Sequence, residues 1–94
     1  MLNNSEIENY YINDEAWENF AKICKNIETK QTKELLTLLN NDIKLVNVIE
    51  YRVLENSLDW ITRNIPALNN LRPIDCVNDN NLLKRLKECL LRMD

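Results

Sequence analysis

Few side chains in this sequence could take part in chemistry, because its 94 residues include three cysteines but no histidine and no glycine. Without histidine, a Ser-His-Asp or Cys-His relay and a histidine zinc site are excluded. Without glycine, a phosphate-binding loop cannot bring backbone amides close to a phosphate. Cys24, Cys76 and Cys89 are widely spaced and form no Cys-x-x-Cys pair. This pattern indicates buried thiols rather than disulfides or a zinc site.

Pairs of acidic residues are the remaining candidates for acid–base chemistry: Glu50 with Glu55, and Asp75 with Asp79. A perturbed acid requires a buried pocket, and the pattern places neither pair in one. We interpret these residues as solvated helix faces and helix caps. The inward positions are aliphatic, so a carboxylate metal site is not expected. We therefore predict a non-enzymatic protein without metal or cofactor, and a metal- or thiol-dependent enzyme is a distant alternative.

The charge of the chain narrows the class of partner. Its formal net charge is −3, and the five charged residues before Lys22 are all acidic. Binding to nucleic acid or to an anionic membrane surface is therefore not expected. The first residues lack the basic start and apolar run of a signal peptide, and no apolar stretch approaches membrane-spanning length. These features predict a cytoplasmic protein.

The elements that must position the functional residues are predicted to be about five helices of a small all-α bundle. Residues 1–13 are polar and rich in asparagine, so we expect a flexible tail. Apolar residues at helical spacing predict short helices within 14–41, followed by a longer periodic segment at 42–63. The β-branched run at 45–53 has strand propensity. Helical spacing continues through Trp60, however, and favours a helix.

The range 42–94 is predicted to form one binding domain. Within it, Pro73 is expected at the first position of a short helix, where proline is well tolerated. Asn69 and Asn70 lie between two leucines, which predicts a tight turn with positive φ, the conformation that glycine usually supplies. This turn is either a simple connection between helices or, together with Arg72, an exposed surface that contacts a partner.

Residues 57–77 read SLDWITRNIPALNNLRPIDCV, and the chain closes with LLKRLKECLLRMD. In order and spacing these segments resemble the toxin-binding domain at the C-terminus of the Xre/MbcA/ParS antitoxins. That domain has a helix ending in Trp-Leu, then Pro-x-x-Ala-Leu-Gly-Gly-x-x-Pro-Leu, and a last helix ending in Leu-x-Arg-Ile. The corresponding positions here are Trp60–Ile61, Ala67–Leu68, Asn69–Asn70 in place of the glycine pair, Pro73–Ile74, and Leu90, Arg92 and Met93.

The resemblance implies an all-α antitoxin that binds a RES-domain toxin, a class of enzyme that consumes NAD or modifies proteins with ADP-ribose. Its C-terminal end would cover the active-site cleft of the toxin within a hetero-oligomer, and a homodimer is possible. The residues expected to contact the partner are Asn69, Asn70 and Arg72 in the turn and Arg92, Met93 and Asp94 at the end. The residues expected to support them are Trp60, Pro66, Leu68, Pro73 and Leu90.

Two alternatives remain open. Members of that family usually carry an N-terminal helix-turn-helix, so residues 14–41 could be a reduced DNA-binding unit of a transcriptional regulator. Their acidic start argues against this alternative. The other is an immunity or interaction protein that uses the same domain against an unrelated partner.

Overall fold

The computed structural model describes residues 14–25 and 28–93, so the tail predicted at 1–13 lies outside the described residues. The described chain is a compact all-α globule, which confirms the predicted fold class. Its elements in chain order are α1 (Asp14–Cys24), α2 (Thr32–Leu38), α3 (Ile43–Val53), the 3₁₀ turn η2 (Leu54–Asn56), α4 (Ser57–Ile61), the 3₁₀ turn η3 (Pro66–Leu68), α5 (Pro73–Cys76) and α6 (Asn80–Arg92). Among these described helices, none combines the length and the apolar character needed to cross a membrane.

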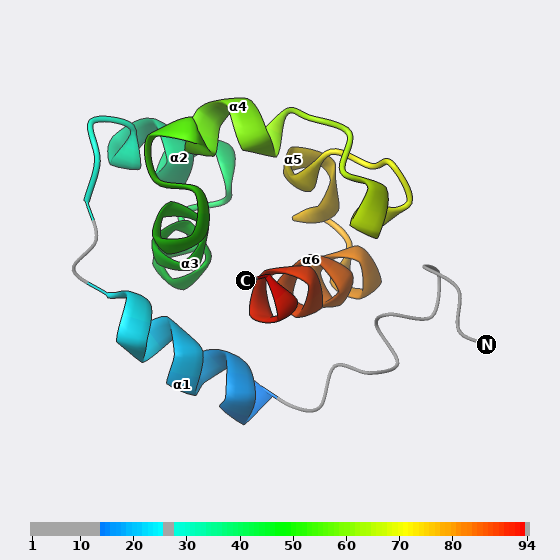
Figure 1. Ribbon diagram of the computed structural model, residues 1–94, viewed down its shortest axis with the longest axis horizontal. Helices are drawn as coiled ribbons and strands as arrows, with labels where there is room; N and C mark the ends of the chain where they lie inside the picture. The colour runs from blue at the N-terminus through cyan, green and yellow to red at the C-terminus, as the bar shows by residue number, and fades with distance from the viewer. Residues whose placement is uncertain (1–13, 26–27, 94) are drawn as a thin grey trace.

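The longer helices form the centre of the molecule. α3 contacts α1, α2 and α6, and α1 also contacts α6. Figure 1 shows α3 and α6 nearly end-on, with α1 running along one side and α2, α4 and α5 along the other. The core between these layers includes Trp17 and Ala21 of α1, Leu35 of α2, Val46 and Ile49 of α3, and Leu86 and Leu90 of α6.

The segment with strand propensity forms the helix α3. Its residues Leu45, Val46, Val48 and Ile49 are fully buried. Burying each such side chain contributes about 1.5–3 kcal/mol, whereas the helix penalty of a β-branched residue is only about 0.5 kcal/mol. The carboxylate of Asp42 also caps the first turn by accepting a hydrogen bond from the backbone N–H of Leu45 at 3.1 Å. Burial and capping together therefore favour the helix.

The continuous helix predicted through Trp60 is wrong at one point, which we call the α3–α4 joint (residues 53–58). α3 ends at Val53, and Leu54 adopts φ 51° and ψ −126°, a conformation outside the helical region. The chain then makes the turn η2 and begins α4 at Ser57. The apolar periodicity of the sequence continues across the joint, so periodicity alone does not reveal the break.

Hydrogen bonds from a remote side chain explain the break. The side-chain amide of Gln31 donates to the carbonyl of Glu55 at 2.9 Å and accepts from the backbone N–H of Leu58 at 3.3 Å. These bonds satisfy backbone groups that a continuous helix would satisfy internally. The joint therefore depends on a tertiary contact as well as on its own residues, where the hydroxyl of Ser57 donates to the carbonyl of Leu54 at 2.5 Å.

The interpretation of Glu50 as part of a solvated helix face is also wrong, because its side chain is fully buried. One carboxylate oxygen, Oε2, lies 2.7 Å from the hydroxyls of both Thr29 and Thr32. These contacts offset part of the cost of burying a carboxylate. They also hold the segment that precedes α2 against α3, and this same segment carries Gln31.

The ends of the short and terminal helices follow the sequence prediction. Pro73 is the first residue of α5. Asp79 caps α6, because its carboxylate accepts hydrogen bonds from the backbone N–H groups of Asn81 and Leu82 at 2.9 and 3.0 Å. The side chain of Asn40, in the turn after α2, lies 3.0 Å from that of Asn78 and joins this turn to the connection before α6.

Candidate functional site

The loop between α4 and α5 presents the predicted asparagine turn. Asn69 and Asn70 have φ values of 57° and 64°, which confirms the predicted positive φ. A β-bridge between Ile65 and Leu71 closes the loop, with the N–H of Ile65 3.0 Å from the carbonyl of Leu71. The side-chain amide of Asn64 donates to the carbonyl of Asn70 at 2.6 Å. The turn is therefore rigid through local hydrogen bonds, while both asparagines remain exposed.

The predicted supporting residues of this loop differ in their burial. Leu68 and Pro73 are both buried, one on each side of the asparagine turn, so both fix the loop on the core. Pro66 is exposed at the first position of η3. Trp60 is partly buried and packs against the core. The loop is therefore held by its leucine and by the proline that begins α5.

Arg72 is exposed, but its guanidinium is already engaged within the chain. Its Nε and Nη2 lie 2.7 and 3.0 Å from the two carboxylate oxygens of Asp75. This bidentate hydrogen bonding lowers the pKa of Asp75 below its ordinary value. The same contact raises the pKa of Arg72. A partner that uses Arg72 must therefore share it with Asp75 or displace that carboxylate.

The end of α6 presents one exposed and one partly covered residue. The Arg92 side chain is 58% exposed, and its Nε donates to Oε2 of Glu88, which is buried, at 2.7 Å. Met93 is partly buried and packs against the core. Leu90 is fully buried and holds the last turn in place. Asp94, the third residue expected at this end, lies outside the described residues.

Arg52 of α3 holds the end of α6 and was not singled out from the sequence. Its Nε and Nη2 donate to the carbonyls of Leu90 and Leu91 at 2.9 and 3.3 Å. Its guanidinium carbon lies 4.6 Å from the ring centroid of Phe20 of α1. A cation at the C-terminal end of a helix also interacts favourably with the helix dipole. Arg52 therefore ties three helices together, through partners 38 and 39 positions away in the chain.

The two groups of predicted partner-binding residues lie in different parts of the molecule. In Figure 1 the yellow loop before α5 lies near the beginning of α6, whereas the red end of α6 lies beside α3. Arg72 hydrogen-bonds to Asp75, three positions along the chain, and Arg92 to Glu88, four positions back along α6. A partner that contacts both groups must therefore extend along α6.

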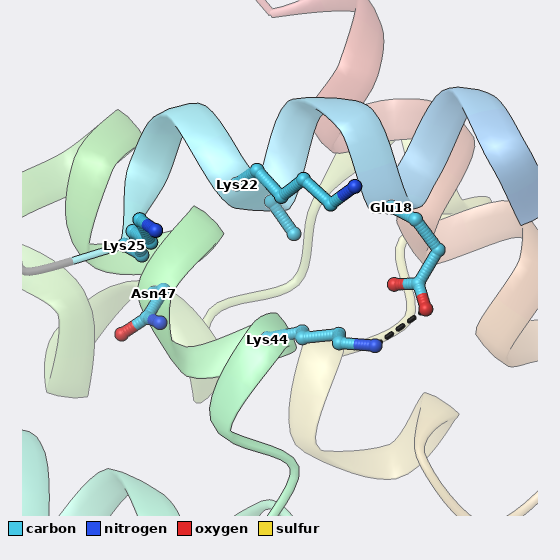
Figure 2. A pocket seen from close by; sticks show the side chains of 6 residues that line it. Glu18, Lys22, Lys25, Lys44 and Asn47 are labelled. Atoms are coloured by element: carbon cyan, nitrogen blue, oxygen red, sulfur yellow. Dashed lines mark hydrogen bonds and ion pairs between the residues drawn. The ribbon is translucent and has the colours of Figure 1, made fainter.

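A cationic groove lies between α1 and α3. Figure 2 shows Lys44 reaching from α3 to Glu18 of α1, with which it forms an ion pair, while Lys25 lies near Asn47 at the other end. Lys22 also lines the groove, whose volume is about 340 Å³. Sequence analysis emphasised the acidic residues of α1 and missed this groove, because Lys44 comes from another helix.

The buried titratable groups do not form a reactive centre in the described part of the chain. Cys24, Cys76 and Cys89 are buried free thiols, as predicted. Burial raises the pKa of all three, and that of Cys76 to about 11, so each remains protonated at neutral pH. Residues 14–25 and 28–93 contain no cluster of acidic or thiol side chains suited to holding a metal ion.

Comparison with protein-family models, with curated proteins and with solved structures found no match to this chain.

Proposed function

We propose that this chain is an antitoxin that binds a RES-domain toxin and covers the toxin's active site with the end of α6. The proposal starts from the resemblance of residues 57–93 to the toxin-binding domain of the Xre/MbcA/ParS antitoxins. One structural observation carries it further: Asn69 and Asn70 both have positive φ at the positions of the family's glycine pair. A glycine pair is used where the backbone must adopt that conformation. The backbone is therefore compatible with the alignment even though the residues differ.

The exposure of Arg92 supports its role at the inhibitory end. Its side chain is 58% exposed, and its Nε donates to Oε2 of Glu88 at 2.7 Å. Guanidinium groups bind carboxylates and phosphates through paired hydrogen bonds. A guanidinium at this end therefore suits a toxin cleft that presents a carboxylate to it.

The geometry of the first two helices does not favour the DNA-binding alternative. A helix-turn-helix joins its helices by a turn of about three or four residues. Residues 25–31 separate α1 from α2, and α2 has only seven residues. We expect no sequence-specific shift when the full chain is mixed with the DNA upstream of its own gene at moderate salt. A specific shift would favour the regulator over the antitoxin.

Co-expression with a RES-domain toxin encoded beside this chain tests the proposal. We expect the chain to rescue growth and to co-purify with the toxin. Arg92→Ala should weaken binding by about 2 kcal/mol, or roughly thirtyfold in Kd, which is typical of an interface hot spot. Lys84→Ala, on the exposed face of the same helix, is the matched control and should leave Kd unchanged.

The outcomes separate the parts of the proposal. A wild-type chain that neither binds the toxin nor rescues growth contradicts the antitoxin function. Rescue that survives Arg92→Ala with an unchanged Kd contradicts the role of the α6 end. Stable co-purification with an unrelated protein, in place of any RES-domain toxin, supports the immunity or interaction protein.

A further inference from the structure

A hollow of about 480 Å³ lies at the α3–α4 joint, outside the residues assigned to the proposed toxin contact. The apolar residues Val53, Leu54 and Trp60 line it, together with Arg52 and Arg63. Tyrosine, tryptophan and arginine are the residues most enriched at the centres of protein interfaces. This hollow has a tryptophan and two arginines in its wall, which is the composition of a binding site for a protein segment.

The exposure and the backbone conformation of Leu54 both lower the stability of the folded chain. It is 57% exposed although it is a large apolar residue, and its φ of 51° with ψ of −126° is a region used almost only by glycine. Either feature alone has many explanations in a folded protein. Their combination at the rim of a hollow makes Leu54 a candidate for a contact with another molecule.

The charge of Arg52 has no counter-ion among the described residues. Its hydrogen bonds go to two backbone carbonyls, of Leu90 and Leu91, and its face lies on the ring of Phe20. These two bonds use two of the five N–H donors of the guanidinium. Arg52 is therefore a fixed, partly buried cation among the residues that line the hollow, and it has donors that these bonds leave unused. Fixing a side chain before binding reduces the entropy that binding must remove.

Arg63 adds a second cation that is easily redirected. It pairs with Asp59, but the two side chains are 64% and 62% exposed. An exposed pair of this kind contributes at most about 1 kcal/mol, so an incoming carboxylate can compete for the guanidinium. With a single carboxylate, Asp59, against two arginines, the lining is cationic although the whole chain carries −3.

We propose that this hollow binds a segment of a partner protein that presents a carboxylate beside an apolar side chain. The carboxylate pairs with Arg52 and Arg63, and the apolar side chain packs against Leu54 and Trp60. A second copy docked hollow against hollow does not fit, because this arrangement would place the arginines of one hollow against those of the other. The inference does not depend on the toxin being the partner.

Selection of random twelve-residue peptides displayed on phage against the full chain tests this proposal. We expect the enriched peptides to contain aspartate or glutamate next to leucine, isoleucine or phenylalanine. A labelled enriched peptide should bind at least tenfold more weakly to Leu54→Gly and to Arg63→Ala. Leu54→Gly removes the side chain but tolerates the positive φ, so the fold is preserved, as circular dichroism can verify. Lys84→Ala is the control and should bind the peptide as the wild type does.

Several results would overturn the proposal. These are the absence of enrichment, enrichment of basic or uncharged peptides, and equal binding by Leu54→Gly and the wild type. A dimer that forms with rising concentration in light scattering and is lost in Leu54→Gly would assign the hollow to a second copy. None of these results bears on rescue from a toxin, so this inference and the proposed function can fail separately.

Discussion

The loop at 64–71 and the α3–α4 joint both contain non-glycine residues with positive φ, but different contacts stabilise the two turns. In the loop, Asn69 and Asn70 have positive φ, and the hydrogen bonds that close the loop come from residues 64–71 themselves. At the joint, Leu54 has positive φ, and Ser57 donates locally to its carbonyl, but two further bonds come from Gln31, 24 and 27 positions away from their partners. One turn is therefore stabilised locally and the other partly from a distance.

This difference between the two turns shows which of them carries backbone strain. Asparagine occupies the left-handed region at modest cost because its short polar side chain bonds locally. Leucine has no such compensation, and residues held in such regions cost about 1–3 kcal/mol each. The loop is therefore close to relaxed, whereas the joint stores strain that the packing of α2 against α3 maintains.

Replacing both loop asparagines by valine should have the largest effect on stability. A β-branched residue is strongly disfavoured in the left-handed region, so Asn69→Val with Asn70→Val should lower the free energy of unfolding by about 3 kcal/mol. Chemical denaturation followed by circular dichroism measures this value. The control is Asn69→Gly with Asn70→Gly, which keeps the turn and should change stability by less than about 0.5 kcal/mol. Equal stability of the two double variants would contradict local control of the loop.

Removing the remote support of the joint should have the next largest effect. Gln31→Ala deletes two hydrogen bonds, to the carbonyl of Glu55 and from the N–H of Leu58. At about 1 kcal/mol for each bond, the free energy of unfolding should fall by about 2 kcal/mol. Glu55→Ala is the matched control, because the bond uses its backbone carbonyl and its side chain is exposed. A loss in Glu55→Ala as large as in Gln31→Ala would show that the joint is held by its own residues.

The same contrast explains how much of the fold could be predicted from the sequence. Residue types close together in the sequence were sufficient to predict the asparagine turn, Pro73 at the start of α5 and the Asp79 cap. The break at Leu54 could not be predicted, because apolar spacing continues across it and the decisive contact comes from Gln31. Glu50 was misinterpreted for the same reason, since Thr29 and Thr32 become its partners only in the folded chain.

The candidate site follows the same division. The positive φ of the asparagine turn was predicted from the residues on either side, and the importance of Arg92 stays a prediction. Arg52 carried no local signal, because its partners Leu90 and Leu91 lie on another helix. The hollow it lines is likewise formed by residues of α3, η2 and α4 and by Arg63 after α4, on either side of the break at Leu54. Sequence periodicity, which implied a straight helix, therefore concealed this surface.

Relieving the strain at the joint should stabilise the protein. Leu54→Gly relieves the backbone strain at this position. The free energy gained by this relief should exceed the entropy cost of ordering the more flexible glycine by about 1 kcal/mol. For a domain of this size, Tm should rise by about 4–8 °C in thermal unfolding. Leu54→Ala is the control: it also shortens the exposed side chain but keeps Cβ, so the strain remains and Tm should not rise. A lower Tm for the glycine variant would mean that Leu54 is relaxed at the joint.

The smallest expected effect concerns Arg72, which can act as a partner contact only by sharing or leaving Asp75. Because Arg72 lowers the pKa of Asp75 below its ordinary value of 3.8, the pair stabilises the folded chain above that pH. The stabilisation is lost as the pH falls through the lowered value, where the folded carboxylate takes up its proton. Arg72→Ala should return the pKa of Asp75 toward 3.8, which a carboxyl NMR titration can follow, with Arg63→Ala as the control for loss of an exposed arginine. An unchanged pKa in Arg72→Ala would mean that the beginning of α5, rather than the arginine, stabilises the carboxylate, and Arg72 would then be free for a partner without competition.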